Sequence, residues 1–90
     1  MNRNELTDYV FNFWLGFINL DEYNKTEEEL FNEIYENLET LNGVEKELGM
    51  VRSAFESGWD EKSKEYQDLD DVWNELNYYK TNLQKEVFYE

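Results

Sequence analysis

The sequence predicts an all-α domain, organised as a small bundle of three or four helices. Hydrophobic residues recur at intervals of three and four through most of the 90 positions. The chain contains no proline, so no helix is interrupted by one. Capping residues and glycines divide the pattern into segments. Because no flexible linker or internal repeat is visible, residues 1–90 are expected to form a single acidic helical domain.

The first helix is predicted from about Glu5 to Asn19. Its hydrophobic residues cover most of the circumference, which is typical of a helix that is central or shared between subunits. A homodimer through this helix is therefore one alternative. A strand over residues 9–14 is another, although no convincing partner strand follows. The residues that define the face are Leu6, Tyr9, Val10, Phe13, Trp14, Phe17 and Ile18.

The second helix has the clearest start signal. Thr26 followed by Glu29 matches a capping box, in which each side chain binds the backbone N–H of the other residue. Acids at 27–29 also suit the positive end of the helix dipole. The helix is predicted to stop at Asn42-Gly43, with Gly43 just beyond its end. Its buried stripe comprises Leu30, Ile34, Leu38 and Leu41.

Two further helices complete the prediction. The third runs from about Val44 to Ser57, with Gly49 and Ala54 allowing a neighbour to approach closely and Gly58 ending it. A polar stretch, 59–67, follows. The fourth helix begins with Asp68 as N-cap and continues nearly to the end of the chain. Its stripe comprises Leu69, Val72, Trp73, Leu76, Tyr79 or Lys80, Leu83 and Val87.

The charge of the chain is strongly unbalanced. Twenty-two Asp and Glu face 8 Lys and Arg, which gives a formal net charge of −14. Aromatic residues make up 18% of the chain, whereas disordered acidic segments contain few of them. We therefore expect a folded domain with an acidic surface. Because like charges repel and cost stability, we also expect a strongly basic partner.

The acids gather in two blocks, within residues 21–39 and 60–75. Glutamates four residues apart on a helix lie about 6 Å apart along its axis. That spacing is near that of successive phosphates on one nucleic-acid strand. An ordinary solvated acidic face is the alternative. The candidate partner-binding residues are Glu29, Glu33 and Glu36 in the first block, Asp60, Glu61, Glu65, Asp68, Asp70, Asp71 and Glu75 in the second, and Trp59 as an aromatic anchor.

Several function classes are disfavoured by composition. Without His or Cys, the commonest catalytic bases, nucleophiles and transition-metal ligands are missing, so we expect no enzyme and no cofactor. Loops starting at Asp21 and Asp60 fail the calcium-loop pattern, because lysines occupy ligand positions. Direct nucleic-acid binding is disfavoured by the negative field. The hydrophobic stretch 9–20 is too short to span a bilayer. No signal peptide is recognisable, and a bacterial cytoplasmic protein is expected.

One segment resembles a known family. The run Ser53-Ala54-Phe55-Glu56-Ser57-Gly58-Trp59-Asp60, followed by acids and then Trp73-Asn74-Glu75-Leu76, is similar to the C-terminal part of a small phage anti-CRISPR family that blocks the type II CRISPR nuclease. The resemblance implies acids that occupy the basic PAM-reading pocket of the nuclease in place of DNA. It covers about a third of the chain. The small central sheet of that family has no counterpart here, because residues 26–41 are predicted to be helical.

The leading functional prediction is therefore an inhibitor that mimics DNA and binds a basic DNA-binding protein, such as a CRISPR nuclease or a restriction enzyme. The competing prediction is a non-catalytic helical adaptor or assembly protein that binds through its apolar aromatic face. In that case the acids only keep the domain in solution.

Overall fold

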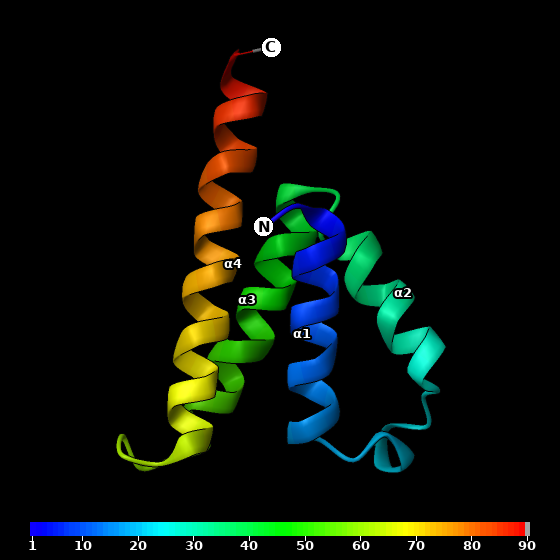
Figure 1. Ribbon diagram of the computed structural model, residues 1–90, viewed down its shortest axis with the longest axis vertical. Helices are drawn as coiled ribbons and strands as arrows, with labels where there is room; N and C mark the ends of the chain where they lie inside the picture. The colour runs from blue at the N-terminus through cyan, green and yellow to red at the C-terminus, as the bar shows by residue number, and fades with distance from the viewer. Residues whose placement is uncertain (90) are drawn as a thin grey trace.

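The computed structural model describes residues 1–89, and it describes side chains through Lys85. Within this range the chain forms four α-helices, one short 3₁₀ helix and no strand (Figure 1). The helices are α1 (Arg3–Phe17), α2 (Glu27–Asn37), α3 (Leu41–Phe55) and α4 (Lys64–Tyr89), and the 3₁₀ helix η1 (Leu20–Tyr23) connects α1 to α2. The predicted all-α bundle is confirmed with four helices, and the strand alternative for residues 9–14 is wrong.

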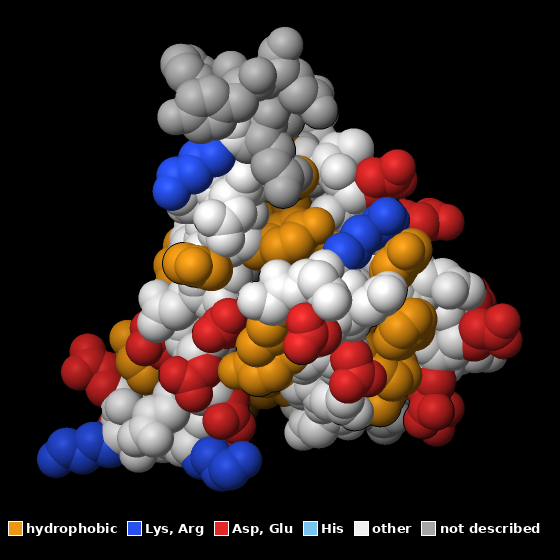
Figure 2. Space-filling view, turned by 45° about the horizontal axis from the view of Figure 1, so that its top comes forward, with side chains coloured by type: hydrophobic (Ala, Val, Ile, Leu, Met, Phe, Trp, Pro, Cys, Tyr) orange, Lys and Arg blue, Asp and Glu red, His pale blue; other side chains and the backbone are white. Residues whose placement is uncertain are grey.

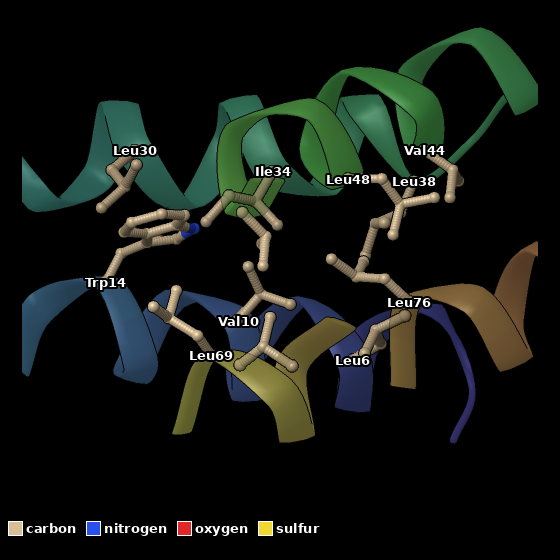
Figure 3. Packing of buried hydrophobic residues seen from close by; sticks show 12 residues of the cluster. Leu6, Val10, Trp14, Leu30, Ile34, Leu38, Val44, Leu48, Leu69 and Leu76 are labelled. Carbon is tan, nitrogen blue, oxygen red and sulfur yellow. The ribbon is translucent and has the colours of Figure 1, made fainter. Parts of the chain in front are cut away.

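The helices pack around one hydrophobic core (Figure 3). Helices α1, α3 and α4 each contribute three residues, α2 contributes two, and Leu38 follows the end of α2. α3 lies against α4, α1 lies against α2, and the contacts of α2 with α3 and of α1 with α4 close the ring. Burial of large side chains at spacings of three and four is what holds such a bundle together. The twelve buried hydrophobic residues of the core are Leu6, Val10, Trp14, Leu30, Ile34, Leu38, Val44, Leu48, Val51, Leu69, Val72 and Leu76. All twelve fall on the predicted stripes. Other predicted stripe residues, such as Leu41, Trp73 and Leu83, are half-buried, and Val87 lies outside the described side chains.

Helices α1 and α2 each begin with a capping box, which satisfies backbone N–H groups that a helix start leaves unpaired. At α2, Thr26 Oγ1 accepts from the backbone N–H of Glu29 and the Glu29 carboxylate accepts from that of Thr26, as the sequence predicts. Asn2 and Glu5 form a second capping box at α1, which starts two residues earlier than predicted.

The predicted end of the second helix is wrong. α2 ends at Asn37, and Thr40 caps α3 by accepting from the backbone N–H of Gly43. Gly43 therefore lies in the first turn of α3, where a Cβ would stand 1.9 Å from the backbone oxygen of Asn37. The Asn42-Gly43 pair resembles a helix stop. However, Gly43 is needed because α2 and α3 meet so closely at their corner.

The role predicted for Gly49 is also wrong. Gly49 is exposed, and a Cβ there would meet nothing within 4 Å. The backbone of α2 thus approaches α3 closely at Gly43, and nothing approaches α3 closely at Gly49. Gly58, with a φ of +88°, follows the end of α3 as predicted.

The predicted start of the fourth helix is wrong as well. Ser63 is the residue that caps α4, since its Oγ accepts from the backbone N–H of Tyr66 and its carbonyl accepts from that of Gln67. Asp68 lies one turn inside the helix. The turn 64–67 is stabilised by packing, because the Tyr66 ring contacts Phe55 edge-to-face with centroids 5.2 Å apart. Composition alone predicts a loop for this turn, because its residues are polar apart from Tyr66.

Candidate functional site: an acidic groove between α1 and α4

The candidate site is a groove between α1 and the first part of α4, with a volume of about 500 Å³. We call it the α1/α4 groove. Its lining has a mixed polar and apolar character, and the apolar part, which we call the floor, is formed by Tyr9, Phe13, Phe17 and Val72. Asp8 borders it on α1, and Glu65 and Asp68 border it on α4. Figure 2 shows one face of the molecule, on which acidic side chains surround exposed hydrophobic ones.

The α1 side of the groove follows from helical geometry. Asp8, Asn12 and Gly16 are four residues apart, so they lie along one side of α1 beside the aromatic face. Phe13 stacks on Phe17 with centroids 5.2 Å apart, which fixes the orientation of both rings. The two aromatic rings therefore support each other in the floor.

Three acids of α4 act electrostatically on Tyr9, which lines the groove from α1. Burial raises the pKa of the Tyr9 phenol above its ordinary value of 10.0, and the charges of Asp71, Glu75 and Asp68 raise it further. Three of the predicted acids thus influence a single side chain of α1. The phenol stays neutral in the physiological range, so it adds no charge of its own to the groove.

One cation lies among the described lining residues of the groove. Lys64 Nζ is 3.1 Å from Asp68 Oδ2, in an i,i+4 pair on α4. The Lys64 side chain is 86% exposed, so the pair is screened and contributes little to stability. Among the described residues, Asp8 and Glu65 at the groove form no ion pair with a Lys or Arg side chain.

The structure brings together only part of the predicted second block. Glu65, Asp68, Asp71 and Glu75 lie at or near the groove. Asp70 is on another side of α4, in a hollow with Arg52 and Trp73.

The remaining acids of that block lie in the turn before α4. Asp60 shapes this turn, since its carboxylate accepts from the backbone N–H of Lys62 and its carbonyl accepts from Ser63 Oγ. Glu61 is exposed in the same turn. Neither residue lines the groove.

The predicted first block is separate and is partly used within the fold. Glu29 closes the capping box of α2, and Glu33 pairs with Lys25. Glu36 is exposed. The row Glu29, Glu33 and Glu36 is therefore no continuous line of unpaired carboxylates.

Trp59 lies at the Phe17 end of the groove. Its side chain is 38% exposed, and its ring centroid is 5.3 Å from that of Phe17. Because the Trp59 ring packs against Phe17 and is also partly exposed, it can contact a partner at low entropic cost.

Sequence reasoning missed the α1 residues of the groove, namely Asp8, Tyr9, Asn12 and Phe13. One signal for them exists in the sequence. Asp8 and Asn12 are polar, four residues apart and set in an otherwise apolar helix. Such a stripe marks an accessible side. The stripe does not specify which helix this side faces, because tertiary packing places α4 there.

The described residues contain no group of three or more His, Cys, Asp or Glu side chains arranged to hold a metal ion. In the same part of the chain, no helix has both the length and the apolar character to cross a bilayer. Comparisons of the chain with protein-family models, curated proteins and solved structures gave no match.

Proposed function

We propose that this domain is a non-catalytic inhibitor that uses carboxylates in place of DNA phosphates and thereby blocks DNA binding by a bacterial defence protein. A type II CRISPR nuclease is the first candidate target, and a restriction enzyme is the second. The proposal places the domain in the bacterial cytoplasm, where both targets act.

The observation that supports this proposal is the composition of the α1/α4 groove. Carboxylates from two helices border one concave surface, and the net charge of the chain is −14. A surface of this kind attracts basic channels at long range, and the attraction weakens as salt is added. The resemblance of residues 53–76 to an anti-CRISPR family points to the same class of target.

The test is a DNA-cleavage assay with a purified type II CRISPR nuclease and a restriction enzyme. We expect inhibition when the domain is added before DNA, and much weaker inhibition when DNA is already bound. Raising the salt concentration should relieve the inhibition. Inhibition that is insensitive to both salt and the order of addition would contradict mimicry.

A capture experiment extends the test to targets outside that panel. The immobilised domain is exposed to bacterial DNA-binding proteins and eluted by a salt gradient, with and without competing duplex DNA. Elution of a nuclease by DNA supports the proposal. Retention of only non-DNA-binding proteins, through salt-resistant contacts, argues against it.

The second candidate function is an adaptor or assembly protein, and a different surface favours it. A hollow of about 380 Å³ lies between the C-terminal end of α1, η1 and α3. Its lining is mainly apolar and includes Tyr23 and Met50, which are 58% and 40% exposed. On this view the partner binds apolar surface, and its affinity changes little with salt. Sedimentation of the isolated domain tests the related alternative of a homodimer.

A further inference from the structure

We propose that the α1/α4 groove binds an arginine side chain that projects from a basic protein segment. This inference rests on the proposed function and specifies the chemistry of the partner. It is drawn from the way the chain accommodates its own arginines, which are Arg3 and Arg52.

Arg3 shows the first such environment. Its guanidinium carbon lies 3.7 Å from the centre of the Tyr35 ring. Its Nε donates to the backbone oxygen of Tyr35 at 2.8 Å, and its Nη2 is 3.7 Å from Glu39 Oε2. A ring face and a carboxylate thus act on one guanidinium.

Arg52 shows the second. Its guanidinium carbon lies 5.5 Å from the centre of the Trp73 ring, within the range of a cation–π contact. Asp70 lines the same hollow, together with Phe55 and Tyr66. Aromatic rings and an acid again lie in the same hollow as the arginine.

The α1/α4 groove has the same two components. Tyr9, Phe13 and Phe17 supply rings, and Asp8, Glu65 and Asp68 supply carboxylates on two sides. However, no arginine is among its described lining residues. Its cation is Lys64, which binds Asp68 from the exposed rim. Each arginine of the chain therefore lies beside rings and an acid, while a third place of this composition is open.

Arginine fits this groove better than lysine does. A guanidinium is planar, weakly hydrated and able to stack on a ring while it donates to carboxylates on either side. An ammonium is more strongly hydrated, and it loses more solvation on reaching an apolar floor. Charge complementarity alone would favour both cations equally.

The experiment compares capped hexa-arginine and hexa-lysine peptides. Each is titrated at low salt into the full ¹⁵N-labelled chain, and amide shifts and affinities are measured. We expect hexa-arginine to bind at least about threefold more tightly, as a modest cation–π contribution requires. The largest shifts should fall on the amides of Tyr9, Phe13, Gly16 and Asp68.

Two double variants locate the contact. Glu65→Gln with Asp68→Asn removes two charges at the groove, and Glu28→Gln with Glu36→Gln removes two exposed charges on α2. The groove variant should lose most of the preference for arginine, while the α2 variant should keep it. Phe13→Leu, which keeps an apolar side chain, should also reduce the preference. Lys64→Gln should strengthen arginine binding about twofold, because it frees Asp68.

The outcomes separate the two proposals. Equal affinity for the two peptides, or equal effects of the two double variants, would overturn the arginine site and leave a general acidic surface intact. Absence of binding by either peptide at low salt would count against both the site and the proposed function. If Phe13→Leu fails to fold, as judged by its amide spectrum, the two charge variants decide the question.

Discussion

The acids of α2 and the acids of the first half of α4 have different roles, although the sequence presents them as similar blocks. On α2, Glu29 caps the helix and Glu33 binds Lys25. On α4, Asp68 has an exposed lysine as its ion-pair partner, and Asp71 and Glu75 act electrostatically on Tyr9. The number of carboxylates in a segment thus does not determine how many are available to a partner. We expect changes on α2 to affect mainly stability, and changes on α4 to affect mainly binding.

The largest expected effect is on binding. Reversal of Glu65, Asp68 and Asp71 to Lys should weaken binding to a basic partner by about 100-fold or more, because attraction is replaced by repulsion. Reversal of Glu22, Glu28 and Glu36 makes the same charge change away from the groove and should weaken binding by only about tenfold, through the long-range field. Calorimetry with the captured target measures both effects. Equal losses would mean that the two regions do not differ in function.

The next largest effect is on stability, at the corner where α2 and α3 meet. Gly43→Ala places a methyl group against the Asn37 carbonyl, so it should reduce the free energy of unfolding by roughly 1–3 kcal/mol. Gly49→Ala is the matched change on the same helix, where space is open, and it should add about 0.5–1 kcal/mol. Urea denaturation measures both. A stabilising Gly43→Ala would refute the close α2–α3 corner.

A third test uses Glu47, which is buried between α3 and α2. Its Oε1 accepts from Asn37 Nδ2 at 2.9 Å, and among the described residues its buried Oε2 has no hydrogen-bond partner. Burial raises the pKa of this carboxyl above 4.5, the Asn37 bond lowers it, the Glu33 charge raises it, and the Lys25 charge lowers it.

The sign of the pH dependence follows from this raised pKa. Above the ordinary pKa the unfolded chain loses its proton first, so the contribution of Glu47 to stability falls as pH rises toward the folded-state pKa. Glu47→Gln removes this dependence. The variant should therefore gain stability relative to the original chain between acidic and neutral pH. Denaturation at several pH values checks this, and a constant difference between the two chains would show that the pKa of Glu47 is not raised.

The smallest effect is local to the start of α2. Thr26→Ala removes the acceptor for the Glu29 N–H and should cost about 1 kcal/mol of stability, whereas Thr26→Ser should keep most of it. Neither change should alter affinity for a basic partner by more than about twofold. A large loss of affinity in Thr26→Ala, at temperatures where it is folded, would place α2 in the binding surface.

The sequence predicts the core well because burial of large side chains dominates the pattern. The three buried hydrophobic residues of α1 and the three of α4 fall on predicted stripes. The errors lie where a weak local signal competes with packing. Asn42-Gly43 matches a helix stop, yet Thr40 provides a cap, and the α2–α3 contact requires glycine. Ser63 caps α4 in the segment 60–67, whose one aromatic residue is Tyr66.

The candidate site is predictable only in part. Acids of α4 such as Asp68 are recognisable from charge alone. Their proximity to Tyr9 depends on the packing of α1 against α4, and periodicity does not specify which helices are neighbours. In the same way, the pairing of Glu33 with Lys25 depends on the path of the chain through η1.

The length of α4 has a practical consequence for measuring distances. The helix continues from the groove to Tyr89, and Val72 and Lys85 are separated by about 20 Å along its axis. A single cysteine in place of Lys85 would carry a fluorophore well away from the groove, in a chain that has no other thiol. Energy transfer between that fluorophore and a labelled partner would then report how the partner is oriented along α4.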